Sequence, residues 1–433
     1  MKLFKLKIIQ IITLFIVFFT LNIVSYSYWA NNDLSTGLLD NSIPIGEWGN
    51  TSQAPNGIPE YNPQDIYATG DLVWFEGNIY EIRNGGYTST PPDENVVYGP
   101  YNEITKEWRL TNTYQDNEVV YFNNNFYFIT NSGQFNGSGL NGTLGYETLN
   151  SIEWDPNQPS YTTNDVVLFN NELYRATAGW TTGQPDQSGN WEKFNSFDWS
   201  PTRIYASAGT LVFYNGNYYT NNWYVQGTAP GNGGPWSLAN IQTWGGKNFA
   251  LNDYALHNGN LYQAIGRNNG QRRNQTPGTL GAFGIWKRVD TQEWQQFNQY
   301  VLNEYVLYQG DVYQVVNQTN ATQTAPGTVF NAWNKVNTSE WQWFNFYQNG
   351  DYVFYNDVPF QVANAANANN NVAPGSISNA WNRIDSLYYQ SFNLYQVNDI
   401  VIYENTAYIA IASSFSVIPG SPGSSSIWAL YSN

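Results

Sequence analysis

The sequence of 433 residues has no cysteine, one histidine and few charged residues. The lack of cysteine excludes disulfide bonds, thiolate metal sites and a lipid-modified cysteine anchor. A transition-metal site is disfavoured because His257 has neither a cysteine nor a second histidine to share a metal with. Charged residues make up 12% of the chain, and its formal net charge is −16. This acidic balance argues against nucleic acid and anionic membranes as partners.

Long apolar runs are also missing, except at the N-terminus. Three lysines among the first seven residues precede a mainly apolar run over residues 8–24, and Ser25-Tyr26-Ser27 follows. This order is typical of a secretory signal peptide cleaved after Ser27. The alternative is a membrane anchor, since about 17 mostly apolar residues approach the lower limit for a span. We expect a secreted, extracellular protein, with the cell surface as a possible location and no membrane contact after cleavage.

Aromatic residues, in contrast, are abundant, at 17% of the chain, and they recur in a pattern that is repeated eight times. Each copy has an apolar strand, a two-residue turn and a second strand that ends near an aromatic residue. Pairs such as Asn-Gly between two such strands predict type I′ hairpin turns, because both central residues need φ > 0. The eight turn pairs are Glu76-Gly77, Asn123-Asn124, Asn170-Asn171, Asn215-Gly216, Asn258-Gly259, Gln309-Gly310, Asn356-Asp357 and Glu404-Asn405.

A second recurring aromatic marks the edge of each repeat at intervals of 45 to 50 residues: Tyr61, Trp108, Trp154, Trp199, Trp244, Trp294, Trp341 and Tyr389. A further aromatic, such as Trp191 or Trp333, lies eight residues before most of these. The sequence therefore predicts an all-β chain of about eight tandem three-stranded antiparallel modules of roughly 46 residues. No amphipathic helix is indicated. A closed eight-bladed propeller-like ring is the alternative, although its blades usually have four strands.

The predicted divisions are a signal peptide (1–27), an extended leader (28–60) and repeats at 61–107, 108–153, 154–198, 199–243, 244–293, 294–340, 341–388 and 389–433. Units of this size are marginally stable alone without a disulfide or a metal. Each repeat must therefore pack a core around its own tyrosines and tryptophans or merge its core with another repeat. Because the links between repeats are short, we expect neighbouring repeats to be in contact.

Seven carboxylates recur at one position before the first strand of a repeat: Asp71, Glu118, Asp165, Asp253, Glu304, Asp351 and Asp399. Paired acids are the signature of glycoside hydrolysis, but an acid that recurs in nearly every copy is better explained as a turn residue. His257 occupies a position that is Phe or Tyr in the other repeats, which predicts a role for its ring shape. We predict no catalytic residue, no metal site and no cofactor.

Aromatic residues present in every copy are expected in the core, so those present in only some copies are candidates for function. They are Trp180, Trp223, Tyr224 and Tyr87. Exposed flat rings suit sugars, because the C–H face of a pyranose can lie on an electron-rich ring. The alternative is that these rings pack against a neighbouring repeat.

The third and fourth repeats resemble the small chitin- or cellulose-binding modules of carbohydrate-binding families 5 and 12. In the third repeat the resemblance rests on Tyr161, Asp165, Val167, Tyr174-Arg175-Ala176, residues 180–185 and residues 191–194. In the fourth it rests on Tyr205, Gly209, Tyr214-Asn215-Gly216, Tyr219, Trp223-Tyr224, Gly227, Pro230 and Trp236. The resemblance implies that the sugar-stacking pair falls on Trp223 and Tyr224, with one member near Trp180. Repeats five to eight keep a Pro-Gly pair but lack the aromatic pair.

The resemblance implies a secreted, non-catalytic protein that binds chitin or a related β-1,4-linked polysaccharide through its middle repeats. Its partner would be an insoluble polysaccharide of the chitin or cellulose type, and self-association is possible. One alternative is a structural or adhesive protein of a cell surface or matrix, which the four repeats without the aromatic pair favour. A second alternative is an accessory part of a glycoside hydrolase system.

Overall fold

A computed structural model describes residues 53–87, 90–92, 100–141, 145–156, 158, 160–231, 233–245, 249–266, 275–321, 323–377 and 379–432. The predicted signal peptide (1–27) and residues 28–52 of the predicted leader lie outside these described residues. Within the described ranges, no helix has both the length and the apolar character needed to cross a membrane.

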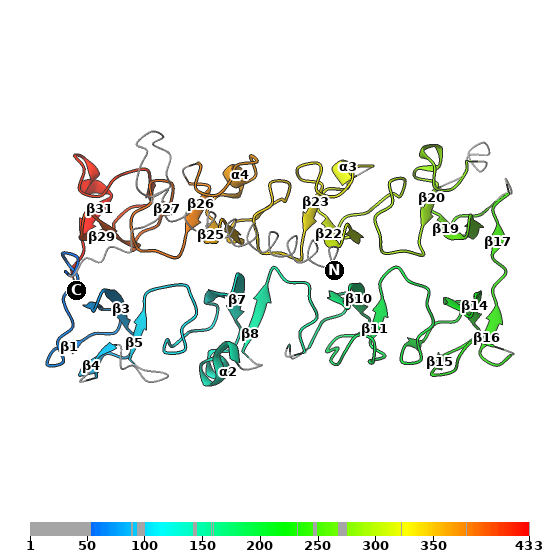
Figure 1. The fold of residues 1–433 in the computed structure, drawn as a ribbon, viewed down its shortest axis with the longest axis horizontal. Helices are drawn as coiled ribbons and strands as arrows, with labels where there is room; N and C mark the ends of the chain where they lie inside the picture. Colours follow the sequence, from blue (N-terminus) through cyan, green and yellow to red (C-terminus); the bar gives the residue numbers. More distant parts are fainter. Residues whose placement is uncertain are drawn as a thin grey trace, which may run out of the picture. The chain divides into compact units, whose positions relative to one another are not determined.

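Eight small antiparallel sheets follow one another along the described chain, one in each predicted repeat (Figure 1). We number these modules 1 to 8 after the predicted repeats. Their strands are β2 (Leu72–Phe75), β3 (Asn78–Ile82) and β5 (Tyr101–Glu103); β6 (Val119–Phe122), β7 (Asn125–Ile129) and β8 (Tyr146–Leu149); β9 (Val166–Phe169), β10 (Glu172–Ala176) and β11 (Trp191–Lys193); and β13 (Leu211–Tyr214), β14 (Asn217–Asn221) and β16 (Trp236–Leu238).

The strands of modules 5 to 8 are β18 (Tyr254–His257), β19 (Asn260–Ala264) and β20 (Trp286–Arg288); β21 (Tyr305–Tyr308), β22 (Asp311–Val315) and β23 (Trp333–Lys335); β24 (Tyr352–Tyr355), β25 (Val358–Val362) and β26 (Trp381–Arg383); and β28 (Ile400–Tyr403), β29 (Thr406–Ala410) and β31 (Trp428–Leu430). Module 5 gains a short parallel strand, β17 (Gln242–Thr243), beside β18. The prediction of tandem three-stranded antiparallel modules is confirmed.

All eight predicted turn pairs have positive φ at both residues, for example 48° at Asn215 and 79° at Gly216. The turn places Val212 opposite Tyr219, and the same register recurs between the other paired hairpin strands, as at Val306 and Tyr313. The local turn chemistry therefore fixes which face of each hairpin is apolar.

In modules 1–4 and 6–8 the loop after the hairpin takes one of two forms. In modules 1, 4 and 8 it returns to pair with the segment before the hairpin, and we call this pairing the ribbon. The ribbon strands are β1 (Ile66–Tyr67) with β4 (Gly86–Tyr87), β12 (Ile204–Tyr205) with β15 (Val225–Gln226), and β27 (Leu394–Tyr395) with β30 (Ser414–Phe415). In module 3 the ribbon is reduced to one bridge, between Tyr161 and Thr181.

In modules 2, 6 and 7 a short α-helix stands in this loop: α2 (Ser132–Ser138), α3 (Gln318–Ala321) and α4 (Ala365–Ala368). Among the described residues, single turns of 3₁₀ helix lie at η2 (Gly139–Asn141), η3 (Leu280–Ala282) and η4 (Ser424–Ser426). The sequence did not indicate any of them, because helices of three to seven residues are too short to show a helical hydrophobic period. Asn131 and Asn364 cap the N-termini of α2 and α4, because their side chains accept hydrogen bonds from backbone N–H groups of the first turn.

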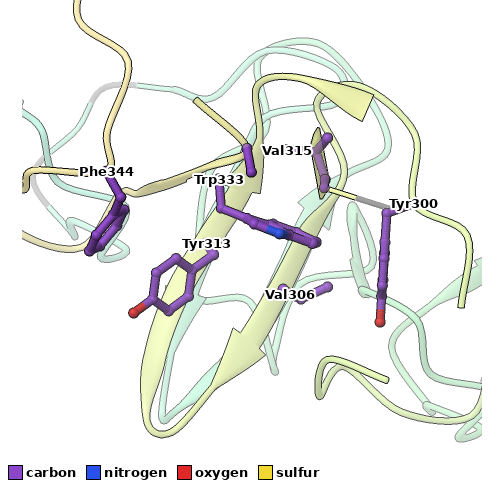
Figure 2. Close-up of a cluster of buried hydrophobic side chains, with 8 residues drawn as sticks. Tyr300, Val306, Tyr313, Val315, Trp333 and Phe344 are labelled. Atoms are coloured by element: carbon purple, nitrogen blue, oxygen red, sulfur yellow. The ribbon is translucent and has the colours of Figure 1, made fainter. Parts of the chain in front are cut away.

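Each module has its own aromatic core on one face of its sheet. In module 6 the Trp333 ring lies across the sheet between Tyr300 and Tyr313, above Val306 and Val315 (Figure 2). Trp333 and the equivalent Trp381 of module 7 are fully buried. The recurring Tyr and Trp residues are core residues, as predicted.

The recurring carboxylates each accept a hydrogen bond from the backbone N–H three residues earlier, as Asp165 does from Thr162 and Asp351 does from Gln348, both at 2.7 Å. The same contact is made by Asp71, Glu118, Asp253, Glu304 and Asp399. These acids therefore order the turn that starts the first strand, as the repeat pattern predicts.

In six of the modules the opposite face of the sheet packs against a module that is distant in sequence. Three clusters of apolar side chains join module 1 to 8, module 2 to 7 and module 3 to 6. At the centre of the second cluster the rings of Phe126 and Phe354 stack with centroids 4.4 Å apart. A closed propeller does not bring module 2 against 7 or module 3 against 6, so the propeller alternative is not observed.

Sequence neighbours are joined by paired asparagines. The side-chain amide of Asn345 in module 7 accepts from the backbone N–H of Lys335 in module 6 and donates to the carbonyl of Lys335. Asn334 of module 6 makes the same two hydrogen bonds with the backbone of Phe346. Phe344 also enters the core of module 6 (Figure 2). The expected contact between neighbouring repeats is therefore present here.

The end of the predicted leader, residues 53–60, packs on both terminal modules. The backbone of Asn56 donates to the carbonyl of Asn405 and accepts from the N–H of Ala407, both at 2.8 Å. Ile58 is buried beside Leu72 of module 1 and Ala407 of module 8. This segment bridges the first and the last module.

Candidate functional site

Trp180 and Tyr224 occupy the same place in modules 3 and 4. Each directly precedes a residue that pairs with a buried tyrosine: Thr181 bridges Tyr161, and Val225 pairs with Tyr205. The sequence alone offsets the two aromatics by one residue relative to their hairpins. Backbone pairing removes that offset and shows that they are equivalent.

The side chains of the candidate residues on these loops are exposed. The exposed fraction is 85% for Trp180, 56% for Trp223 and 57% for Tyr224, whereas the core residues Trp191 and Trp236 of the same modules are each 2% exposed. Among the described residues, no other ring contacts Trp180, Trp223 or Tyr224. More than half of each of these three side chains is therefore exposed to solvent.

The backbone beneath Trp223 is held by a buried asparagine. The side-chain N–H groups of Asn221 donate to the carbonyls of Tyr205 and Trp223, at 3.1 and 3.0 Å. Its side-chain oxygen accepts from the N–H of Thr210 at 2.7 Å. Because Asn221 is 2% exposed, these bonds are shielded from water, and the loop position of Trp223 is fixed before any ligand arrives.

Module 3 fixes its loop by different contacts. The hydroxyl of the fully buried Thr181 donates to the carbonyl of Ala178 at 2.6 Å. The indole N–H of Trp191 donates to the carbonyl of Gly183 at 2.9 Å. Trp180 itself has φ = 58°, in the left-handed region, which costs a residue with a side chain about 1–2 kcal/mol. Strained backbone of this kind persists only where the surrounding contacts hold it in place, and it is frequently found at functional sites.

The two loops belong to adjacent modules joined by a charged junction. The guanidinium of Arg203 donates to the carboxylate of Glu192 at 2.5 Å and lies 5.1 Å from the centre of the Tyr205 ring. The amide of Gln226 donates to the carbonyl of Thr202 at 3.1 Å. The contact of Arg203 with Glu192 connects the third strand of module 3 with module 4, and the contact of Gln226 with Thr202 holds the ribbon of module 4 beside this junction.

Tyr87, the remaining candidate, is not equivalent to the other three. Its backbone pairs with Ile66 at the outer position of the ribbon, and its side chain lies outside the described part of the chain. The position equivalent to Tyr224 is Gly85. Tyr87 instead corresponds to Phe415 of module 8, which pairs with Leu394 and is 47% exposed. Sequence reasoning missed Phe415, because only the ribbon register relates it to Tyr87.

The tyrosines beneath the loops are neutral structural groups. Burial raises the pKa of Tyr161 to about 12, and it also raises the pKa of Tyr205. The hydroxyl of Tyr205 accepts from the N–H of Ser200 at 2.7 Å. His257 lies edge-on to Trp244 with centroids 5.1 Å apart, as Tyr308 does to Trp294 at 5.4 Å. The ring of His257 thus has the aromatic role that its repeat position predicts.

The described residues contain no group of three or more His, Cys, Asp or Glu residues placed to hold a metal ion. The site therefore consists of exposed rings on an ordered backbone, with nearby hydrogen-bonding groups of the chain. Comparison with known proteins gave no matching family model and no matching curated sequence.

Proposed function

We propose that the protein is a secreted, non-catalytic binder of an insoluble β-1,4-linked polysaccharide of the chitin or cellulose type. The observation that carries the proposal is the exposure of Trp180, Trp223 and Tyr224 on loops whose backbone is held by buried hydrogen bonds. A large ring left in water costs free energy that is recovered when a flat apolar surface covers it. The C–H face of a pyranose is such a surface.

Binding by one loop is expected to be weak. A stacked ring contributes about 0.5–1.5 kcal/mol, by analogy with aromatic pairs. Modules 3 and 4 are joined through Arg203 and Glu192, so both loops are available on one chain. If both reach the same polymer surface, avidity gains on the order of 10²–10⁴ follow. A polymer is therefore expected to bind far better than a short oligosaccharide.

The test is a pull-down on insoluble chitin and on cellulose with the secreted chain. The variant Trp180→Ala/Trp223→Ala/Tyr224→Ala should be lost from the polymer fraction, because it removes the three exposed rings. Trp343→Ala is the matched control, since Trp343 is 41% exposed but lies in module 7. Equal retention of the wild-type and triple-variant chains would contradict the proposal, provided that near-ultraviolet circular dichroism shows both to be folded.

A second candidate function is a structural or adhesive role with self-association. Modules 5, 6 and 7 each present an exposed aliphatic residue at the same place after a Pro-Gly pair, and these are Leu280, Val329 and Ile377. In the first two of these modules, the threonine directly before the aliphatic residue anchors the turn with its hydroxyl. Thr328, for example, donates to the carbonyl of Ala325 at 2.6 Å. Light scattering at increasing protein concentration tests this role. Assembly that Leu280→Asp/Val329→Asp/Ile377→Asp abolishes, without retention on any glycan, would favour it over polysaccharide binding.

A further inference from the structure

A cavity of about 570 Å³ lies between the hairpins of modules 4 and 5, within the roughly 300–1,000 Å³ range of small-molecule pockets. Its apolar wall includes Phe197, Phe213, Tyr218, Leu238 and Leu256. The rings of Phe213 and Tyr218 lie 4.9 Å apart and inclined at 51°, and Phe197 meets Tyr218 edge-on at 6.5 Å. The cavity is open to water, since Leu238 is 67% exposed and Phe213 is 36% exposed.

The cavity has an identifiable cause in the sequence, which is Ala239. The N–H of Ala239 donates to the carbonyl of Tyr218, the second residue of the middle strand. The residue that makes this contact elsewhere is large and fills the interface between paired modules. These residues are Ile104 and Tyr431 between modules 1 and 8, Leu149 and Ile384 between modules 2 and 7, and Phe194 and Val336 between modules 3 and 6.

Ala239 therefore distinguishes module 4 from the other seven modules at this position. Val289, which makes this contact in module 5, is large, whereas Ala239 of module 4 has only a methyl group. The space that Phe194 fills in module 3 is consequently left open in module 4. Apolar walls exposed in this way are costly unless a ligand covers them.

The charged groups that line the cavity are all acidic, and its uncharged polar residues include Ser196 and Asn217. Asp198 and Asp290 are among its lining residues, and none of these lining residues is Lys, Arg or His. Asp290 accepts from the N–H of Leu261 and from Arg288, both at 2.8 Å, so its charge is partly balanced from outside the cavity. The Asp198 side chain is 64% exposed, and its carboxylate accepts from the hydroxyl of Ser196 at 3.0 Å and lies 3.7 Å from the ammonium of Lys193, so it keeps an open side toward water.

The pKa of Tyr218 is affected by the same two carboxylates. Burial first, and then the charges of Asp290 and Asp198, raise the pKa of Tyr218 to about 12. Its hydroxyl therefore stays protonated, and the surrounding carboxylates disfavour any further negative charge. A ligand for this cavity should bring an apolar body and a positive charge.

We propose that the cavity binds an organic ammonium ion with an aryl or alkyl body. The body would occupy the space left by Ala239 against Leu238 and Leu256, and the ammonium would lie near Asp198. A cation beside the faces of Phe213 and Tyr218 gains a further attraction from their ring electrons. This site is separate from the glycan-binding loops and does not depend on the proposed function.

The probe is 2-phenylethylammonium, titrated calorimetrically into the secreted chain, with the neutral 2-phenylethanol as its matched partner. The amine should bind at least about tenfold more tightly, since a cation–π contact and a nearby carboxylate together supply the roughly 1.4 kcal/mol that a factor of ten requires. Equal affinity for the two compounds would overturn the assignment of a cation site.

Ala239→Phe is the decisive variant, because phenylalanine already occupies the equivalent position in module 3 as Phe194. It should fill the cavity, keep the fold and abolish binding of the amine. Asp198→Asn should weaken binding of the amine several-fold and leave the alcohol unaffected, while Trp223→Ala should change neither. Undiminished binding by Ala239→Phe would refute the site. So would a wild-type chain that binds neither compound while Ala239→Phe melts at a higher temperature, because the cavity would then be only a packing defect.

Discussion

The side-chain amide of Asn345 makes two hydrogen bonds with the backbone of Lys335, although the two residues belong to different modules. Its oxygen accepts from the N–H of Lys335 at 2.9 Å, and its N–H group donates to the carbonyl of Lys335 at 3.2 Å. The same arrangement joins Asn112 to Glu103, Asn298 to Arg288 and Asn393 to Arg383. Four junctions between neighbouring modules thus share one polar clamp.

Asn345→Ala is expected to destabilise the chain by about 1–3 kcal/mol, because it leaves two backbone groups of Lys335 without partners in a shielded place. The measurement is a urea unfolding curve. Asn370→Ala is the control, since Asn370 is an exposed asparagine of the same module. If the two variants had the same midpoint, the clamp would contribute nothing.

Gln292 ends repeat 5 (244–293), but its backbone carbonyl accepts from the N–H of Leu307 in module 6, so Gln292→Ala is expected to loosen the pairing of modules 3 and 6. The amide of Gln292 accepts from the N–H of Leu173 at 2.8 Å and donates to the carbonyls of Leu173 and Phe194, at 2.9 and 2.6 Å. Amide hydrogen exchange should show faster exchange at Leu173 in this variant. Gln296→Ala, at an exposed glutamine nearby, should leave that rate unchanged. Unchanged protection of Leu173 in Gln292→Ala would argue against the pairing.

Trp180→Gly is expected to be more stable than Trp180→Ala, by about 0.5–1 kcal/mol. Glycine avoids the cost of about 1–2 kcal/mol that a side chain incurs in the left-handed region, although it loses roughly 0.5–1 kcal/mol more chain entropy on folding. Denaturant midpoints measure the difference. At Trp223, a described residue whose φ is not positive, the alanine variant should instead be more stable than the glycine variant. Neither Trp180 variant should bind glycan as well as the wild type.

The stability of the protein is expected to fall as the pH rises from about 10 to about 12. Burial raises the pKa of Tyr121, Tyr161 and Tyr218 from 10.0 to about 12. The folded chain therefore holds these protons more tightly than the unfolded chain does, and that contribution is complete below pH 10 and lost above it. Unfolding midpoints across this range, with tyrosinate absorbance in parallel, test it. Tyr121→Phe should show a shallower decline, and a flat profile for the wild type would contradict the assignment.

The hairpins and module cores could be predicted from the sequence because both depend on nearby residues. A pair such as Asn215-Gly216 determines its own turn, and the turn determines the register of Val212 and Tyr219. The recurrence of Trp333 and its equivalents identified core positions by repetition alone. These signals lie within one repeat, where the separation along the chain is short.

The pairing of distant modules could not be predicted in this way. Phe126 and Phe354 are ordinary apolar strand residues, and nothing in the periodicity of either strand indicates its partner. The candidate site was predicted in part. Trp180 and Tyr224 were identified, but their equivalence depends on pairing with Tyr161 and Tyr205, which a residue count misplaces by one. Ala239 is conspicuous only once the seven larger residues at its position are superimposed by their hydrogen bonds.

The bridge that Asn56 makes to Asn405 and Ala407 has a consequence for the order of folding. Each module closes through contacts between residues near in sequence, which form early, whereas contacts of high sequence separation form late. Module 8 is synthesised after modules 1 to 7, so the apolar surface of Ile58 and Leu72 stays uncovered until module 8 has been made. A chain in which module 8 has not yet folded therefore exposes apolar surface of module 1, which is the kind of surface that promotes aggregation, and packing of module 8 covers it.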